Sequence, residues 1–301
     1  MQLTPTIFCL AFVLPGLLMA AAGFLGRFKK LGRAAPLLTL VALVAGFTAA
    51  YWQLEPAPTW PLAHAPVIQW VLCLAGAVGL IELIGSMLKF PAWLRAIFLL
   101  AAVALCCWKT VSPLRGDSLT NPQVALAISI AGLVAVGWWW SMQHLCARAP
   151  GALPPIFVAI FCVCCAVVLS TWHIQRSATL AGALTAIAAG SLVGTFFSRS
   201  TAQSLALGAI LLILLPILFN GYFYSDDAFP PTANVFVTLL LAAPLAALFG
   251  ELPPIQRILA RRGLLRWAFY LLPMIVLAGA AVSYNVHNFL LADQQQASED
   301  E

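Results

Sequence analysis

The sequence predicts an all-α integral membrane protein, a bundle of about ten transmembrane helices. Three observations predict this class: 62% of the 301 residues are hydrophobic, only 8% are charged, and the mean hydropathy is +0.97. Soluble domains are about 45–50% apolar and about 25% charged. With 15 basic and 10 acidic side chains, a chain of this length cannot cover a soluble surface. The composition therefore excludes a soluble enzyme, a nucleic-acid-binding domain and a disordered protein.

Ten apolar runs along the chain are long enough to be spanning helices. A transmembrane helix needs about 20 mostly apolar residues, and in lipid each span must satisfy its own backbone hydrogen bonds. The least distinct boundaries are at 89–91 and 198–201, where charged or helix-breaking residues separate neighbouring runs. The ten runs cover residues 5–25, 36–53, 67–88, 92–111, 123–146, 154–175, 178–197, 202–223, 232–250 and 265–285.

The first run is expected to be a retained span rather than a cleaved signal peptide. It lacks a positively charged segment at its start, and its apolar stretch from Ile7 to Leu25 is longer than that of a usual signal peptide. The basic cluster in 27–33 follows it as a stop-transfer pattern. We therefore count this run as the first of the ten spans.

The distribution of Lys and Arg over alternate loops predicts the orientation, with both termini outside (N-out, C-out). Cytoplasmic loops carry an excess of Lys and Arg, and here 12 of these residues fall on one side and 3 on the other. A missed span would mix the two sets, so the split also supports the count of ten. The inner set is Arg27, Lys29, Lys30, Arg33, Lys89, Arg95, Arg148, Arg199, Arg257, Arg261, Arg262 and Arg266; the outer set is Lys109, Arg115 and Arg176.

The loops are too short to hold a soluble domain. We therefore predict one transmembrane helical domain over residues 1–285, followed by an acidic C-terminal tail over 286–301. The ten tryptophans fall near predicted span ends, where amphipathic rings favour the membrane interface, and we interpret them as interface anchors. Prolines interrupt several spans, and static kinks are the favoured interpretation. They are Pro15, Pro216, Pro244 and Pro273.

A seam of small residues is predicted along one helix face in the run 178–197. Its members are spaced four apart, which places them in a line and lets two helix backbones approach closely. We call these residues the small-residue seam, and we expect packing within the chain more often than self-association. The seam consists of Gly182, Ala186, Gly190 and Gly194.

Glu82 is the one carboxylate well inside a predicted span, and it is the candidate for binding a substrate or a proton. A charge at the bilayer centre costs about 2.5–3.5 kcal/mol on insertion scales, and such residues usually face protein or water. Small residues, Ala75 and Gly79 among them, share its helix face, so we expect Glu82 to face other helices. The alternative is a structural carboxyl that is protonated or paired with a polar group.

The sequence predicts no metal site, no cofactor and no enzyme active site. Cys162 and Cys165 share a helix face, but no His or carboxylate is close in sequence at that depth, and we interpret them as small apolar filler. The four histidines are scattered near span ends, with no pair at metal-ligand spacing. No nucleophile, base and orienting acid share an evident depth.

One segment, 220–254, carries a recognisable pattern. It reads Asn220-Gly221-Tyr222-Phe223-Tyr224, then Ser225-Asp226-Asp227 and Pro230-Pro231, then Ala243-Pro244-Leu245 and Glu251-Leu252-Pro253-Pro254. This pattern resembles uncharacterised polytopic membrane proteins of planctomycete bacteria. The resemblance implies a bacterial inner-membrane setting; it brings no activity, so no catalytic residue is carried over.

Two main functional hypotheses follow for a multi-pass protein of the cell inner membrane. The leading one is a permease-like carrier of a small solute. The alternative is a non-transporting membrane-embedded subunit or scaffold that binds a partner protein through the small-residue seam or the basic loops. An intramembrane enzyme acting on lipid has the least support. The expected partners are the lipid bilayer and either a small solute or a membrane protein, and no nucleic acid.

Overall fold

The computed structural model describes residues 8–28, 34–54, 66–116, 118–149, 151–197, 202–224, 231–252 and 263–299, and within them the chain is helical, without strands. This confirms the predicted all-α class for these residues. The elements are η1 (Cys9–Val13), α2 (Leu14–Leu25), α3 (Ala35–Trp52), α4 (Val67–Met87), α5 (Ala92–Val111), η4 (Ser112–Leu114), α6 (Asn121–Arg148), α7 (Leu153–Thr171), α8 (Gln175–Phe197), α9 (Ala202–Phe223), α10 (Pro231–Ala242), η5 (Ala243–Glu251) and α12 (Gly263–Glu299).

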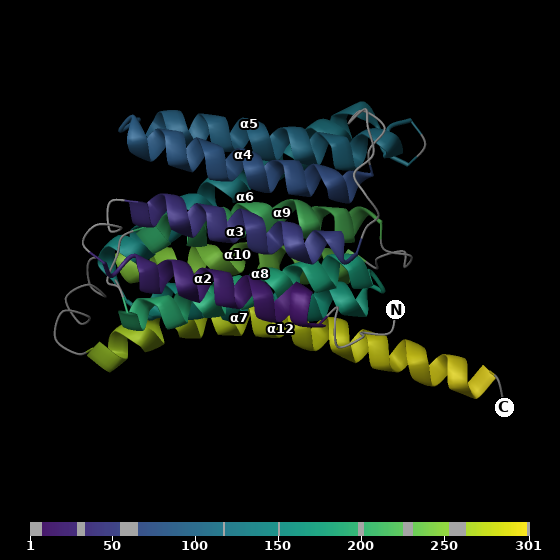
Figure 1. Cartoon of the computed structure of the whole chain (residues 1–301). Helices are drawn as coiled ribbons and strands as arrows, with labels where there is room; N and C mark the ends of the chain where they lie inside the picture. The colour runs from purple at the N-terminus through teal and green to yellow at the C-terminus, as the bar shows by residue number, and fades with distance from the viewer. Residues whose placement is uncertain are drawn as a thin grey trace.

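Each predicted apolar run coincides with one helix or with two that follow directly on each other. Within the described residues, 8 helices are long and apolar enough to cross a membrane, and two apolar segments, Cys9–Leu25 and Asn234–Phe249, are shorter. The structure thus fits a multi-pass membrane bundle, while the count of ten spans stays a prediction. The start of η1 and the end of α12 lie at the same end of the bundle (Figure 1), as an even number of passes requires.

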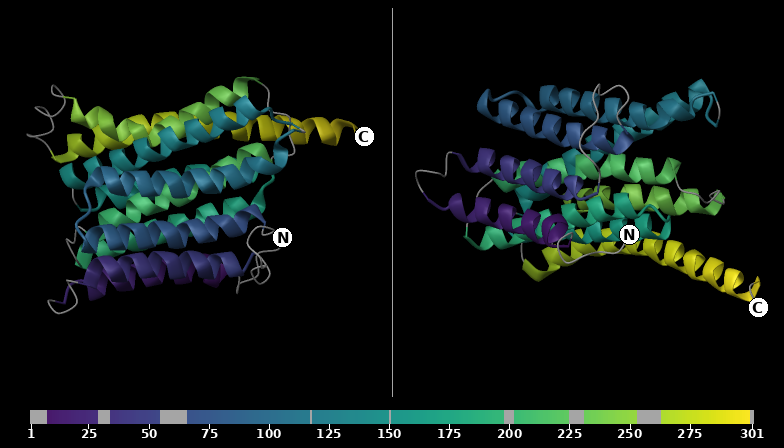
Figure 2. Two further views of the ribbon diagram at one scale, coloured as in Figure 1. Left: turned by 90° about the horizontal axis from the view of Figure 1, so that it is seen from above. Right: turned by 45° about the vertical axis from the view of Figure 1, so that its right-hand side comes forward.

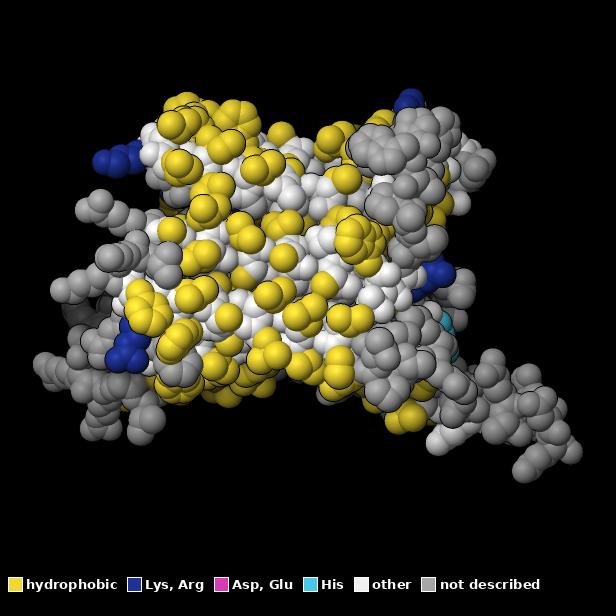
Figure 3. All heavy atoms as spheres, viewed as in Figure 1, with side chains coloured by type: hydrophobic (Ala, Val, Ile, Leu, Met, Phe, Trp, Pro, Cys, Tyr) yellow, Lys and Arg dark blue, Asp and Glu magenta, His cyan; other side chains and the backbone are white. Residues whose placement is uncertain are grey.

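The surface matches the hydrophobic interior of a membrane. On the face seen in Figure 3, hydrophobic side chains cover the middle of the molecule, and the Lys and Arg side chains that are drawn lie only towards its two ends. Large apolar side chains such as Leu133, Leu80 and Phe196 are more than half exposed. In water such a surface would aggregate; in lipid it is the expected outer layer.

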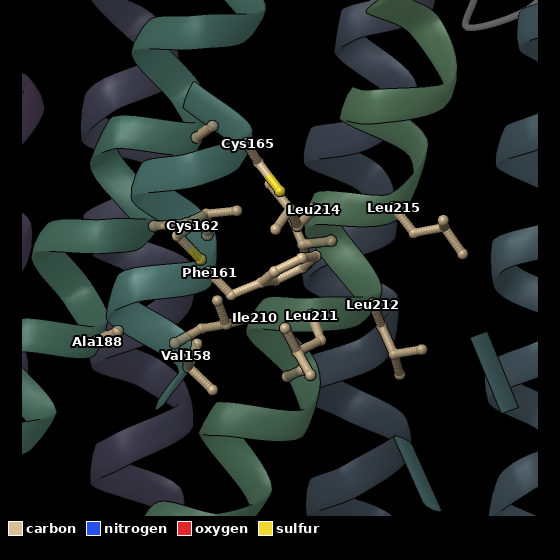
Figure 4. Close-up of a cluster of buried hydrophobic side chains, with 14 of the residues drawn as sticks. Val158, Phe161, Cys162, Cys165, Ala188, Ile210, Leu211, Leu212, Leu214 and Leu215 are labelled. Atoms are coloured by element: carbon tan, nitrogen blue, oxygen red, sulfur yellow. The ribbon is translucent and has the colours of Figure 1, made fainter. Parts of the chain in front are cut away.

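Helix α9 is the centre of the bundle. Every residue from 206 to 218 is buried, and α9 packs against α3, α4, α5, α6, α7 and α8. Figure 4 shows Phe161 and Cys165 of α7 beside Leu214 of α9 within a cluster of buried apolar side chains. A helix that is surrounded by other helices is hydrophobic on all sides. The buried part of α9 therefore has no polar face.

Helix α12 lies at the edge of the bundle and is much longer than the predicted span 265–285. It runs without a break to Glu299, so the predicted acidic tail continues the last spanning helix through 286–299. Both views of Figure 2 show its C-terminal end projecting beyond the other helices. Helix α12 contacts α7, α10 and η5.

The small-residue seam of α8 packs against η1 and α2 of the same chain. At Gly190 the two backbones are so close that a Cβ atom would collide with the carbonyl of Gly16. Such contacts need glycine on at least one of the two helices. The facing pairs are Gly182 with Phe12, Ala186 with Gly16, Gly190 with Gly16, and Gly194 with Gly23.

The interpretation of all tryptophans as interface anchors is wrong for three of them. Trp138, Trp139 and Trp172 are at most 5% exposed, and each indole N–H donates a hydrogen bond to another helix. Burying a large ring in protein is favourable when its one polar atom finds an acceptor. Trp52, Trp93 and four other tryptophans are not buried, and the interpretation stays open for them.

The contact between α2 and α8 predicts a sharp difference between two glycine substitutions. Gly190→Ala places a Cβ against the backbone of Gly16, with the Gly16 carbonyl carbon 2.9 Å away, so the helices must separate at a cost of about 1–3 kcal/mol. Gly76→Ala in α4 meets nothing within 4 Å and is expected to be neutral or stabilising by up to about 1 kcal/mol. Thermal unfolding of the purified variants in detergent measures both; equal midpoints would contradict the seam contact.

Candidate functional site

The tight turn between α4 and α5 sets up the candidate site. Helix α4 ends at Met87 with Leu88 as its C-cap, and Lys89 adopts the left-handed backbone conformation with φ 54°. The amide of Phe90 donates to the Gly85 carbonyl at 2.9 Å, which is the closing bond of a Schellman motif. Pro91 then caps the start of α5. The two helices therefore form an antiparallel hairpin, in which residues at equal distances from the turn come side by side.

Glu82 and Arg95 are such a pair. The Arg95 Nη1 atom lies 3.3 Å from Glu82 Oε2. The Glu82 side chain is 1% exposed, whereas the Arg95 side chain is 20% exposed. Gly85 makes room for this ion pair, because a Cβ at that position would meet the Arg95 side chain.

The second Glu82 oxygen is held by a third helix. The indole Nε1 of Trp139, in α6, donates to Glu82 Oε1 at 2.9 Å. Each carboxyl oxygen thus accepts a hydrogen bond from a different helix, and both partners are donors. An ionised carboxylate accepts at both oxygens, so this arrangement suits the charged form of Glu82. Helices α4, α5 and α6 are tied together at one point.

Glu82 therefore faces other helices, with a charged partner and an indole as its hydrogen-bond donors. The ion pair is not fully satisfied, since Arg95 Nε is buried and has no acceptor among the described residues. Buried ion pairs often stabilise a protein no more than apolar side chains of similar volume do, but loss of one partner alone strongly destabilises it. We conclude that the pair is a poor source of stability and a strong constraint on how the three helices can move.

A small apolar cavity adjoins the indole of Trp139. Its volume is about 10 Å³, at the lower limit for a single water molecule. Helices α5, α6 and α9 contribute its lining, which consists of Ala96, Leu99, Leu100, Ala135, Val136, Trp139 and Leu212. Trp139, which donates to the Glu82 carboxylate, thus also lines an apolar void.

The other candidate residues of the sequence lie apart from Glu82. The small-residue seam belongs to the contact between α8 and α2. Cys162 and Cys165 are buried in the apolar cluster between α7 and α9 (Figure 4). Among the described residues, no group of three His, Cys, Asp or Glu side chains is placed to hold a metal ion.

Sequence reasoning missed Arg95 and Trp139 as partners of Glu82. The signal for Arg95 was present: Lys89 and Pro91 mark the turn, and Glu82 and Arg95 are equally far from residues 88–89. In an antiparallel hairpin this spacing places the two charges together. No such local signal exists for Trp139, which is 57 residues away from Glu82 and meets it only through helix packing.

The opposite end of the bundle carries a second set of polar contacts. Three residues of the segment 220–224 form side-chain hydrogen bonds with the helices α8, α10 and α5. The Trp172 indole donates to the Asn285 side chain at 2.8 Å, which fixes α7 to α12. The remaining contacts are Asn220 with Ser177, Tyr222 with Asn234, and Tyr224 with the carbonyl of Thr110.

No family model, no curated protein and no solved structure matches the chain.

The unequal burial of Glu82 and Arg95 predicts unequal effects of their substitution. Arg95→Gln leaves the fully buried carboxylate without its cation, and we expect it to lose about 3–5 kcal/mol. Glu82→Gln should cost less, because the partly exposed Arg95 can extend its charged group toward the helix end. The double variant, which leaves no unpaired charge, should resemble Glu82→Gln.

Unfolding in detergent measures this series, with expression level as a second readout. A small and equal effect of both single substitutions would mean that the ion pair does not constrain the helices.

Proposed function

We propose that the chain is a ten-span protein of the bacterial inner membrane, N-out and C-out, and that it acts as a permease-like carrier of a small solute. The observation that carries this proposal is the Glu82–Arg95–Trp139 contact, in which an ion pair and an indole join three helices beside an apolar cavity. Intramembrane ionisable residues are rare and commonly mark solute or proton pathways.

In this proposal the contact is the closed state of a gate at the inner end of the bundle. Glu82 lies five residues before the end of α4, and Arg95 is the fourth residue of α5, so both are about 5–8 Å from the helix ends at 1.5 Å rise per residue. Opening the gate requires α6 to leave Glu82 and the cavity to widen. Because residues of α6 and Leu212 of α9 both line the cavity, opening the gate also changes the contact between α6 and α9.

A discontinuous helix also supports a carrier. Helix α10 ends at Ala242 and continues as the 3-10 segment η5, which packs against α6 and α12. Carriers often place broken helices at the sites where they bind and release solutes.

The proposed orientation follows from the Lys and Arg split and predicts the result of a fusion experiment. A reporter fused after Glu301 should be active in the periplasm. A reporter inserted within 27–35 should be active in the cytoplasm, because residues 27–35 carry four of the inner basic residues. A cytoplasmic signal from the C-terminal fusion would mean that the number of spans is odd or that the orientation is reversed.

A second candidate function is favoured by α12. Helix α12 contacts the end of α7 at Asn285, which accepts the Trp172 hydrogen bond. Beyond this point α12 continues and exposes Phe289, Leu290 and Leu291. A projecting helix with exposed apolar side chains is the kind of element that a non-transporting subunit uses to bind a partner. In that case the Glu82–Arg95–Trp139 contact has a structural role and stays closed.

Thiol accessibility separates the two candidates without knowledge of the solute. Ala135 is 1% exposed and lines the cavity. A carrier must open toward water, so Ala135→Cys should react with a membrane-impermeant thiol reagent faster than the buried native cysteines do. Glu82→Gln in the same background should raise the rate further, because the bond that closes the gate is weakened.

Ala188→Cys is the matched control, since Ala188 is fully buried in α8 among apolar side chains and should stay unreactive in either case. If Ala135→Cys is as inert as Ala188→Cys, with and without Glu82→Gln, the site does not open and the subunit function is favoured.

A further inference from the structure

The segment that follows α10 is unusual in its helical register. Helix α10 stops at Ala242, and η5 continues for 9 residues as a 3-10 helix to Glu251. Runs of 3-10 helix longer than three or four residues are uncommon, and within a longer helix they often mark a hinge or strain. The 3-10 pairing extends to the end of the segment, where the Leu252 amide donates to the Phe249 carbonyl.

Pro244 determines which carbonyl groups lose their partners. A proline has no amide hydrogen, so the α-helical bond from residue 244 to the Leu240 carbonyl cannot form. In an α-helix that continued through Pro244, the Leu245 amide would pair with the carbonyl of Leu241, four residues earlier. In a 3-10 helix the same amide pairs with Ala242, three residues earlier. The 3-10 register therefore leaves the Leu241 carbonyl without a backbone donor.

The indole of Trp138 supplies that donor. Its Nε1 atom donates to the Leu241 carbonyl at 2.7 Å. The indole is fully buried and makes an edge contact with Phe161, at 5.2 Å between ring centroids and 85° between planes. The backbone of α6 at the neighbouring Gly137 also lies close to η5, because a Cβ at Gly137 would meet the Leu245 side chain. Trp138 is thus held in place by Phe161 of α7, and its indole faces a carbonyl that the 3-10 register frees.

We infer that segment 243–251 is a two-register element, and that the Trp138 indole selects its 3-10 form by competing with the Leu245 amide for the Leu241 carbonyl. Pro244 weakens the α-helical form, and Trp138 stabilises the 3-10 form. The two forms differ in length by about 0.5 Å per residue, or roughly 4–5 Å over the segment. Because η5 packs against α6 and α12, a change of register would move α12 relative to α6. This inference does not depend on the proposed transport.

The distance between two labelled positions on this segment tests the inference. Val235 in α10 and Phe249 in η5 are both more than half exposed, so spin labels carried by a noncanonical amino acid fit there and leave the native cysteines in place. In nanodiscs, double electron–electron resonance on Trp138→Phe should give a distance about 3–4 Å shorter than in the parent, because the residues between the labels return to the α rise.

Trp140→Phe is the matched control. Trp140 is the second residue after Trp138 and is half exposed, and its substitution should leave the distance unchanged. Pro244→Ala restores an amide at position 244 while keeping the buried indole, and it should shorten the distance as well. An unchanged distance in Pro244→Ala, or in a folded Trp138→Phe, overturns the inference. If Trp138→Phe does not fold, the result for Pro244→Ala decides.

Discussion

The structure depends on one constraint: a polar group inside an apolar bundle is costly unless it finds a hydrogen-bond partner within the chain. An unsatisfied group in hydrocarbon costs several kcal/mol. Three buried indoles meet this constraint with three different acceptors: a carboxylate, a backbone carbonyl and a side-chain amide oxygen. Each bond joins helices that are distant in sequence. The tryptophans therefore define the position of α6 against α4, of α6 against α10, and of α7 against α12.

Packing without polar groups holds the rest of the bundle. The centre of α9 is apolar on every side and buried by six neighbouring helices, and α8 meets α2 through backbone contacts at Gly16 and Gly23. In lipid, close backbone packing of this kind takes the place of the hydrophobic effect between helices. The three indole contacts and the glycine contacts between α2 and α8 lie in different parts of the bundle. The proposed gate at Glu82 does not involve the contact of α2 with α8.

Much of the fold was predictable because spanning helices depend on local sequence. The apolar runs marked the helices to within a few residues at most ends, and the small neighbours of Glu82 indicated correctly that it faces other helices. The end of α12 was missed because the prediction followed hydropathy, and polar residues continue a helix equally well once it leaves the apolar layer. Among the prolines, Pro216 and Pro273 lie inside continuous helices, whereas Pro244 stands at the change to a 3-10 register.

The partners of Glu82 and the roles of the tryptophans were harder to predict, for a physical reason. The local sequence around a tryptophan near a span end does not show whether its indole contacts a lipid headgroup or another helix. Only the packing of helices that are distant in sequence decides between these two environments. Arg95 is the exception, since the geometry of the hairpin alone places it beside Glu82. The same reasoning explains why Trp138 could not be linked with Pro244 from sequence, since they are more than 100 residues apart.

The most direct test of this account is the state of the tryptophan indoles. Proton–nitrogen correlation spectra of protein labelled with ¹⁵N-indole tryptophan should show three strongly hydrogen-bonded N–H signals, shifted downfield from the others and assigned to Trp138, Trp139 and Trp172 by substitution to Phe. The signal of Trp139 alone should move upfield in Glu82→Leu, because its acceptor is lost. If these three indoles resemble the exposed ones, or if Glu82→Leu leaves Trp139 unchanged, the polar contacts do not define the bundle and the account is wrong.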